Sequence, residues 1–294
     1  MLFRSTAQTF SEFYGRQAAE FPPEAREAEY ARRIERSYPI HPELFTRLYD
    51  DWSTLERFQR TRGVLRLMAQ VIHALWSDND RSPMIMPGLL PIDDPTVANE
   101  IVSNLSEQWP PIIHRDVDGE ESTPRAIDLQ YPNLNQYAAT RRVARTVLLG
   151  SAPSPNPANR GIEIQRVRLG SVMPGEQVAV FNDALAKLVA RATYLYNEGT
   201  RYWYGTQAHV GQLARDRAEQ IRASRGDIIE VEIRERLTTI CNPRGEFGGV
   251  HVMPTAVGDV ADSDEVRLVV LSPEQSHQGR GESPATAEIG RAHV

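Results

Sequence analysis

The stretch DWSTLERFQRTRGVLRLMAQVIHALW, residues 51–76, decides the helical character of the first part of this chain. From Val64 onward its apolar residues recur at intervals of three and four, which predicts an amphipathic helix. The positions expected to face inward are Val64, Leu65, Met68, Val71, Ile72, Leu75 and Trp76. Because a glycine inside a helix costs about 1 kcal/mol against alanine, Gly63 predicts a junction between two helices. Ser53–Glu56 reads S-T-L-E, a capping box that predicts the start of the first helix.

Arginines occupy another face of the same stretch. Arg62 and Arg66 are four residues apart, and Gln70 and His73 extend their side. Like charges at this spacing repel each other weakly, so the pair calls for an explanation. A guanidinium stays charged and forks onto phosphate oxygens, so one interpretation is a sensor for a nucleotide bound by another domain. The alternative is a solvated face that pairs with nearby acids.

Shorter helices are expected on the N-terminal side. Residues 24–36, EAREAEYARRIER, predict a charged helix with Tyr30 and Ile34 on one face, and the prolines of YPIHP end it. His41 between those prolines is interpreted as a turn or packing residue. The segment ELFTRLYDDW predicts a short amphipathic helix, whose inward residues are Leu44, Phe45, Leu48 and Tyr49.

On the C-terminal side, residues 83–135 are rich in proline and aspartate and predict a connector with one helix near 96–107. A compact unit from about Gln136 to Gln207 follows, with helices expected in QYAATRRVARTVLLG, GIEIQRVRLGSV and VFNDALAKLVARA. The β-branched residues of the second segment leave a strand open. ATYLYNEGTRYWYGTQ reads as an aromatic hairpin around Asn-Glu-Gly. Three helices followed by a hairpin form a winged-helix pattern.

Beyond this unit, helices are expected near 209–224 and 226–241, and VHVMP and VRLVVL predict two strands. The strands resemble the opening of a further α/β unit. The polar, Gly-, Ser- and Pro-containing segment that follows is expected to stay unpacked. The final residues, EIGRAHV, resemble the translation of a common sequencing adapter, so we expect 288–294 to be an artefact and the natural chain to continue past about Ala287.

Composition excludes several classes of protein. The 294 residues carry a net charge of −6, which argues against coating of nucleic acid by charge alone but leaves room for local basic patches. The single cysteine, Cys241, excludes a disulfide framework and a cysteine-rich zinc site. No run of about 18 apolar residues is present, so no membrane span is expected and the expected compartment is the cytoplasm.

No catalytic constellation is visible. The sequence has no G-x-x-x-x-G-K-[ST] phosphate loop, no G-x-S-x-G and no H-E-x-x-H, and its histidines show no paired spacing for a metal. We therefore expect neither catalytic residues nor metal ligands in this chain. Basic residues remain as candidates for contact with a DNA backbone. They are Arg141, Arg142, Arg145, Lys187, Arg191 and Arg201. The would-be recognition helix carries few of them, beside Asp183, so base reading has little support.

Several long blocks of the chain resemble one family. They are EFPPEAREAEYARRIERSYPIHPELFTRLYDDWSTLERFQRTRGVLRLMAQVIHALW, RRVARTVLLGSAP, the run from ANRG to LGSVMPGE, and ATYLYNEGTRYWYGTQ. In this order they are similar to the "domain of unknown function 499" family, bacterial and archaeal ATP-binding proteins of the AAA+ type. The resemblance covers about residues 10–271. Because members are often encoded beside DNA methylases and other defence genes, it implies ATP-dependent work on or near DNA, directed against invading DNA such as that of phages.

The resemblance also implies that parts of the ATPase lie outside this chain. The phosphate loop, the acidic metal-binding strand and the first sensor would lie upstream of Met1. ATP and Mg²⁺ would then be bound by a missing N-terminal core and not by this chain alone. TRGVLR falls where AAA+ lids carry a second sensor arginine, which makes Arg66 the first candidate and Arg62 the second.

The predicted fold class is mainly α with small β content, in five regions. They are an AAA+ lid-like helical region (1–90), a Pro/Asp-rich connector (91–135), a winged-helix-like unit (136–208), helices plus the start of an α/β unit (209–271), and a disordered tail (272–294).

Two functions of different classes remain open. The first is a C-terminal-side fragment of an AAA+-type ATPase in DNA-related defence or modification, not catalytically competent alone. Its partners would be the missing core, a DNA methylase or other defence proteins, and DNA. The alternative is a non-enzymatic winged-helix DNA-binding or protein-adaptor module.

Overall fold

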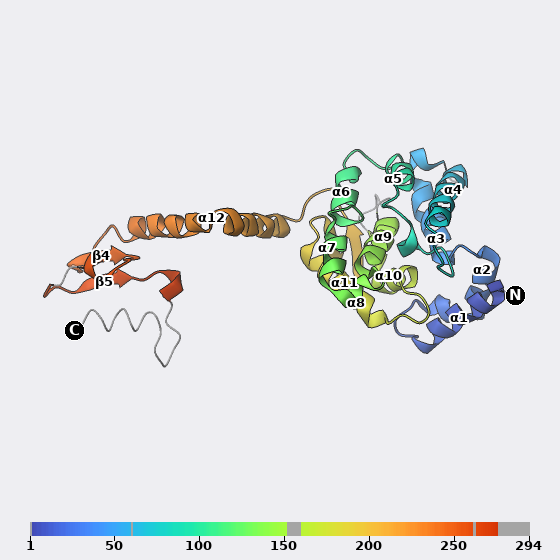
Figure 1. Cartoon of the computed structure of the whole chain (residues 1–294), viewed down its shortest axis with the longest axis horizontal. Helices are drawn as coiled ribbons and strands as arrows, with labels where there is room; N and C mark the ends of the chain where they lie inside the picture. Colours follow the sequence, from blue (N-terminus) through green and yellow to red (C-terminus); the bar gives the residue numbers. More distant parts are fainter. Residues whose placement is uncertain (1, 60, 152–159, 261–262, 276–294) are drawn as a thin grey trace. The chain divides into compact units, whose positions relative to one another are not determined.

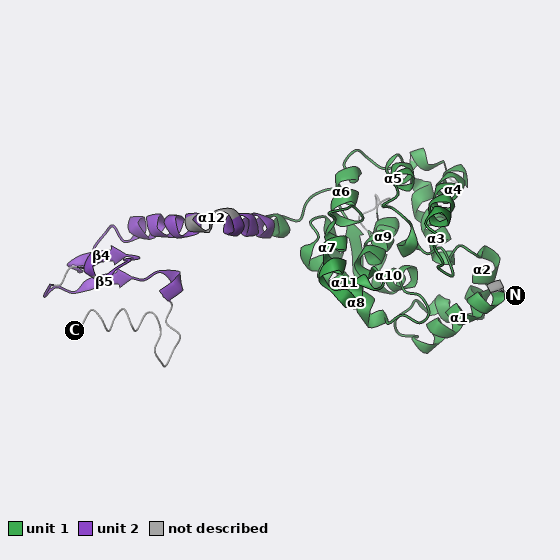
Figure 2. Ribbon diagram, viewed as in Figure 1, with its two compact units in different colours: residues 1–213 green, residues 214–294 purple. Residues whose placement is uncertain are grey.

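The computed structural model describes residues 2–59, 61–151, 160–260 and 263–275. The chain divides into two compact units, residues 1–213 and residues 214–294 (Figure 2). The first unit is mainly helical and contains a small antiparallel sheet, and the second contains a pair of parallel strands. This confirms the predicted mainly α fold class with small β content. Within the first unit, the predicted boundaries near residues 90 and 135 separate no compact parts.

Short helices and turns build the N-terminal part of the first unit (Figure 1). They are α1 (Leu2–Arg16), η1 (Pro23–Arg26), α2 (Ala28–Ser37), α3 (Pro42–Thr46), η2 (Arg47–Asp51), η3 (Trp52–Thr54) and η4 (Glu56–Phe58). α2 buries Tyr30 and Ile34, as its spacing predicts. Leu44 and Leu48 are buried as well, but Tyr49 is exposed, contrary to the prediction.

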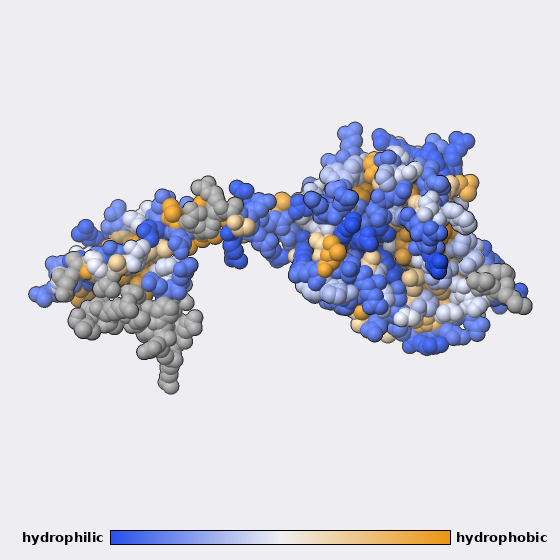
Figure 3. All heavy atoms as spheres, in the orientation of Figure 1, coloured by the Kyte–Doolittle hydropathy of each residue, from blue (hydrophilic) through white to orange (hydrophobic). Residues whose placement is uncertain are grey.

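Helix α4 (Thr61–Ser77) is the helix predicted from the apolar stripe, but it buries a shifted face. Its buried residues are Gly63, Val64, Leu67, Met68, Val71 and Ala74. Leu65, Ile72 and Trp76 are exposed, Trp76 by 83%, so the prediction that they face inward is wrong. The apolar stripe is wider than the face that neighbouring elements cover, and tertiary contacts select part of it. On the face drawn in Figure 3, hydrophobic residues of the first unit lie in separate small patches among hydrophilic ones.

The expected helix junction lies just before Gly63. Gln59 has a left-handed backbone with φ of 52°, and α4 begins at Thr61. A Cβ on Gly63 would lie 1.7 Å from the carbonyl oxygen of Phe58, so only glycine allows this close approach. Ser53 lies in η3, and its hydroxyl donates to the carbonyl of Tyr49 instead of capping a helix. The capping-box prediction is therefore wrong.

We expect Gly63→Ala to lower the free energy of unfolding by about 1–3 kcal/mol, the usual cost of overpacking, although alanine is the better helix former. The measurement is urea unfolding followed by tryptophan fluorescence. Gly15→Ala is the matched control, since a Cβ there meets nothing within 4 Å. The control should be neutral or stabilising by roughly 0.5 kcal/mol. Equal effects of the two substitutions would contradict the close approach at Gly63.

The Pro/Asp-rich region contains four helices where one, near 96–107, was predicted. After η5 (Pro87–Leu89) it contains α5 (Pro95–Val102), α6 (Trp109–Asp116), α7 (Thr123–Gln130) and α8 (Pro132–Asn135). A proline occupies the first turn of each of these four helices, where its missing N–H costs nothing. Asp94 caps α5, because its carboxylate accepts from the amides of Thr96 and Val97 at 2.8 and 3.0 Å. The prolines of this region thus mark helix starts.

The segment 139–204 is built around a buried helix, α9 (Ala139–Ser151). It also contains β1 (Ile162–Glu163), α10 (Ile164–Ser171), α11 (Val178–Arg191), β2 (Leu195–Glu198) and β3 (Arg201–Tyr204). The strands form an antiparallel sheet in the order β1-β3-β2, in which Tyr196 lies opposite Trp203. The predicted hairpin is confirmed. GIEIQRVRLGSV contains both structures that its residues left open, a short strand and then a helix.

The second unit holds most of α12 (Val210–Ile240), which is one helix where two were predicted. Strands β4 (Gly249–Val252) and β5 (Arg267–Val270) confirm the two predicted strands and pair in parallel, with His251 opposite Val269. The short turns η7 (Val257–Asp259) and η8 (Pro273–Gln275) complete it. The predictions for 276–294, including the adapter-like heptapeptide, lie outside the described residues. In the described parts of the chain, no helix is both long and apolar enough to cross a membrane.

His41 caps α3 from a fully buried position, in agreement with a packing role. Its Nδ1 accepts from the backbone amide of Glu43 at 3.2 Å, and its Nε2 lies 2.9 Å from the hydroxyl of Tyr14. The neutral tautomer that satisfies both contacts has its proton on Nε2, which donates to the Tyr14 oxygen. Burial, assisted by the positive charge of Arg33, lowers the pKa of His41 to about 3.

This pKa predicts a loss of stability in mild acid. Between the folded and unfolded pKa values the unfolded chain binds the proton and the folded chain does not, so stability falls as the pH falls through that window. Acidification from about pH 7 to about pH 5 should cost about 2 kcal/mol through His41 alone. His41→Asn keeps a capping side chain but cannot titrate, so its unfolding free energy should lack this component. His73→Asn, on an exposed part of α4, should follow the wild type. Parallel pH profiles for His41→Asn and the wild type would refute the assignment.

Candidate functional site

Arg66 lies on α4 near a surface hollow and is held by one carboxylate. Its Nε donates to Glu100 Oε1 of α5 at 2.7 Å. The Arg66 side chain is 49% exposed, whereas that of Glu100 is 13% exposed. The ion pair therefore fixes the guanidinium at the surface while leaving part of it open to solvent.

The hollow beside this ion pair has a volume of about 490 Å³. Arg57, Arg66 and Gln70 line one side of it, and residues of α5 and the turn after it line the other. The second group comprises Thr96, Asn99, Glu100, Ser103 and Asn104. Among the described residues, none forms a hydrogen bond or an ion pair with Arg57. Two guanidinium groups against one carboxylate, with hydroxyl and amide groups around them, suit an anionic ligand.

The structure separates the two sensor candidates. Arg66 and Gln70 line the hollow together, but Arg62 is exposed outside its lining. Sequence reasoning missed Arg57, because the turn at Gln59 interrupts the helical spacing that would have related it to Arg66. It also missed Glu100, which lies 34 residues from its partner and gives no local signal.

Two of the predicted DNA contacts are buried in ion pairs. Arg142 donates to both oxygens of Glu176 at 2.6 and 3.0 Å, and to the carbonyl of Ser171. Arg145 donates to Asp118 at 2.6 Å and to Asp93 at 2.9 Å. Burial raises the pKa of Asp118, and the neighbouring Arg145 opposes that rise.

Because both guanidinium groups are buried and already paired, Arg142 and Arg145 are unavailable to a DNA phosphate. We therefore withdraw them as candidates for DNA contact. These two arginines instead form ion pairs that connect α9 to the segments around it.

Arg141 is half-buried beside the same acids. Its Nη1 lies 3.7 Å from Asp93 and 3.9 Å from Asp118. Its backbone amide, together with that of Thr140, donates to the carboxylate of Asp128 at 3.2 and 2.9 Å. Asp128 belongs to α7, so the N-terminus of α9 is capped by a neighbouring helix. This arrangement gives the Arg141 segment a structural role.

The three remaining basic candidates also have partners. Lys187 lies 3.2 Å from Asp183, and its Nζ is 4.3 Å from the centre of the Tyr131 ring. Arg191 donates to Gln130 at 2.6 Å. The basic face of α11 therefore lies against the α7–α8 corner. In the sheet, Arg201 donates to Glu163 at 3.1 Å.

No cluster of metal-ligating groups accompanies these sites. Across the described residues, no group of three or more His, Cys, Asp or Glu side chains is placed to hold a metal ion. The hollow at Arg66 thus offers charge complementarity to an anion, with one acid that already has a partner.

The fold and this site define a mainly helical protein with a surface hollow suited to an anionic group. Residues 24–162, which include α4, α5 and the hollow, match the family model described as the DUF499 second domain. The match supports a DUF499 family, in agreement with the resemblance of the long sequence blocks. No curated protein and no solved structure matches the chain.

Proposed function

We propose that this chain is the helical, non-catalytic part of an AAA+-type ATP-binding protein that acts in DNA-related defence or modification. ATP and Mg²⁺ would be bound by a core that precedes the chain, and Arg66 would contact the phosphates of that nucleotide. The observation that carries the proposal is the hollow at Arg66, which lies within the segment that matches the DUF499 second domain.

The ion pair with Glu100 supports this role for Arg66. Glu100, only 13% exposed, holds the guanidinium through Nε alone, at 2.7 Å. The terminal nitrogens of the half-exposed guanidinium can therefore contact a phosphate while the ion pair stays in place. Arg57 supplies a second positive charge to the same hollow, and Arg62 remains the secondary candidate because it lies outside the lining.

The complete gene product provides the test. Its upstream reading frame should encode G-x-x-x-x-G-K-[ST], and a frame without this motif would refute the ATPase assignment. In the complete protein, Arg66→Ala should lower kcat for ATP hydrolysis by about 100-fold or more, the usual cost of removing one preorganised group from developing charge. Arg36→Ala is the matched control, since the Arg36 side chain is 75% exposed on α2, and it should stay within about twofold of the wild type, as exposed substitutions do. If the folded Arg66→Ala variant hydrolyses ATP at the wild-type rate, Arg66 is part of a solvated face and does not contact the nucleotide.

A second proposed function, from another class, is a non-enzymatic winged-helix module that binds DNA or an adaptor protein. The element order α9-β1-α10-α11-β2-β3 and the strand order β1-β3-β2 support the winged-helix assignment. Because the basic face of α11 lies against α7 and α8, the arrangement favours a protein partner, such as a DNA methylase or another defence protein, over DNA.

Binding of the chain to duplex DNA at low salt tests this alternative. We expect no salt-dependent binding of the chain to duplex DNA, since the basic side chains already have partners. Salt-dependent binding that is lost on Lys187→Gln with Arg191→Gln would instead establish contact between α11 and DNA.

A further inference from the structure

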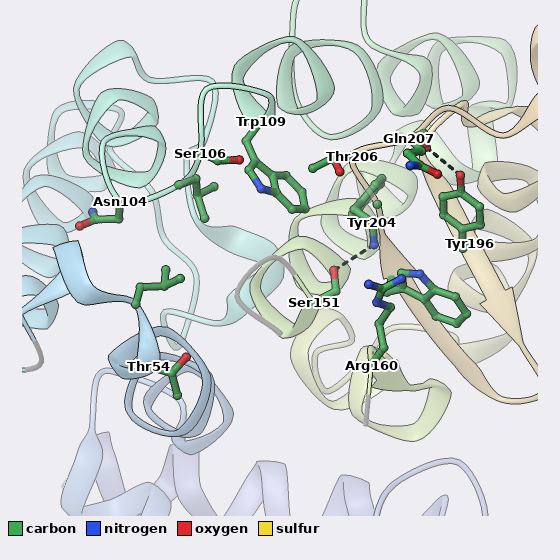
Figure 4. Close-up of a pocket in the computed structure, with 14 residues that line it drawn as sticks. Thr54, Asn104, Ser106, Trp109, Ser151, Arg160, Tyr196, Tyr204, Thr206 and Gln207 are labelled. Atoms are coloured by element: carbon green, nitrogen blue, oxygen red, sulfur yellow. Dashed lines mark hydrogen bonds between the residues drawn. The ribbon is translucent and has the colours of Figure 1, made fainter. Parts of the chain in front are cut away.

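A second, larger cavity of about 600 Å³ lies within the first unit, beside the β2–β3 hairpin (Figure 4). Trp109 and Ser106, from α6 and the turn before it, line one side, and Tyr196, Trp203 and Tyr204 of the hairpin line another. Its volume falls in the range of small-molecule sites. The hollow at Arg66 and this cavity are lined by different arginines.

Aromatic rings form a fixed wall of this cavity. The rings of Tyr196 and Trp203 are stacked, with centroids 6.0 Å apart and an interplanar angle of 9°. Tyr196 donates its hydroxyl to the carbonyl of Gln207, and Tyr204 donates its hydroxyl to the carbonyl of Asp116, both at 2.7 Å. Figure 4 shows Trp109 pointing toward the cavity from the other side. Because hydrogen bonds already hold the tyrosines, a flat ligand can stack without first ordering the wall.

The polar lining indicates the charge of the ligand. Among the described lining residues, Arg160 is the single charged side chain, and it is exposed. Hydroxyl and amide side chains supply both donors and acceptors, as the edges of a nucleobase require. They belong to Thr54, Ser106, Thr206 and Gln207; Asn104 also lines the cavity, but its amide nitrogen already donates to the carbonyl of Glu100 at 2.6 Å. A cavity with aromatic walls, neutral hydrogen-bonding groups and one cation therefore suits a flat heterocycle that carries an anionic group.

We propose that this cavity binds one unpaired nucleobase, stacked on the aromatic wall, with its phosphate at Arg160. The nucleotide is either free or part of a single strand, since both present the same base and phosphate. Stacking on aromatic side chains combined with a guanidinium contact is the chemistry by which proteins bind unpaired bases. Asn104 lines both this cavity and the hollow at Arg66, but the proposal does not rest on the proposed contact between Arg66 and a nucleotide of a preceding core.

The test measures binding of the full chain to AMP, TMP, a labelled short oligothymidylate and a blunt DNA duplex, by fluorescence anisotropy and tryptophan quenching. The oligothymidylate or a mononucleotide should bind, and the duplex should not. Trp203→Leu should weaken binding by about 5- to 150-fold, the effect of losing one stacked base. Arg160→Gln should weaken it and reduce the salt slope by about 0.7, the value for one phosphate of a single strand.

Controls keep the result interpretable. Arg26→Gln, at an exposed arginine outside the cavity, should bind as the wild type does. If Trp203→Leu loses its far-ultraviolet dichroism and is therefore unfolded, Ser106→Trp serves as the test variant instead. Ser106 is exposed, so a tryptophan there can fill the cavity without disturbing the core. Binding of the oligothymidylate alone identifies a single strand as the ligand, and equal binding of mononucleotides identifies a free nucleotide. Failure of every probe, or wild-type affinity of Arg160→Gln and Ser106→Trp, would overturn the proposal.

Discussion

Replacing Glu176 with alanine is expected to lower the free energy of unfolding by about 3–5 kcal/mol, because it leaves a buried guanidinium without its counter-charge. The side chains of Arg142 and Glu176 are only 5% and 10% exposed. Glu176 also accepts from the backbone amide of Met173 at 2.7 Å, so its loss breaks a third contact. The Arg142 guanidinium lies 4.9 Å from the centre of the Phe181 ring, and its burial keeps it from solvent.

Urea unfolding measured by tryptophan emission reports on this effect, because all four tryptophans lie in the first unit. Glu12→Ala is the matched control, since Glu12 pairs with Arg16 at 50% and 77% exposure and should contribute less than about 1 kcal/mol. The double variant Glu176→Leu with Arg142→Met removes both charges and should recover most of the loss. A small effect of Glu176→Ala alone would mean that water reaches Arg142 in the folded protein.

Trp52→Ala should be similarly destabilising, at about 3–5 kcal/mol, the usual range for deleting a buried aromatic side chain. Trp52 is fully buried, its ring lies 5.8 Å from that of Phe58, and its Nε1 donates to the carbonyl of Leu149 at 2.9 Å. That hydrogen bond joins η3 to α9 across 97 residues of sequence. Its loss should therefore loosen the contact between the N-terminal helices and the central helix.

Trp52→Phe separates the two contributions. It keeps most of the ring but removes the donor, so it should cost about 1–3 kcal/mol, the penalty for an unpaired buried acceptor. Trp76→Ala is the control, because Trp76 is 83% exposed on α4 and its removal should change stability by less than about 0.5 kcal/mol. Far-ultraviolet circular dichroism follows unfolding of all three variants. Equal losses for Trp52→Ala and Trp76→Ala would contradict the burial of Trp52.

Local patterns predicted the elements whose signal lies within a few residues. The spacing of Tyr30 and Ile34 predicted the buried face of α2, and the aromatic alternation around Asn-Glu-Gly predicted the β2–β3 hairpin. In the proline-rich region one helix near 96–107 was predicted, whereas Pro124 and Pro132 lie in the first turns of two further helices, α7 and α8. They were missed because a proline that ends one segment and a proline that starts the next helix look alike in sequence.

The candidate site could be predicted only in part. Arg66 was recognisable, since its face of the helix carries polar residues at regular spacing. Its partner Glu100 and its neighbour Arg57 were not, since Glu100 lies on another helix and Arg57 precedes the turn at Gln59. Arg145 was wrongly predicted to contact DNA. Its acidic partners lie 27 and 52 residues away, so the local sequence showed only a cluster of basic residues.

The sequence by itself determined the mainly helical class, the family resemblance and the hairpin, because spacing, turn residues and long similar blocks are local properties. Only the tertiary structure decided which side of α4 is buried, which arginines remain exposed and where the two cavities lie. The physical reason is that burial and ion pairing depend on which distant segments approach each other. A residue such as Arg142 is basic in any context, but the approach of Glu176 makes it a buried structural contact.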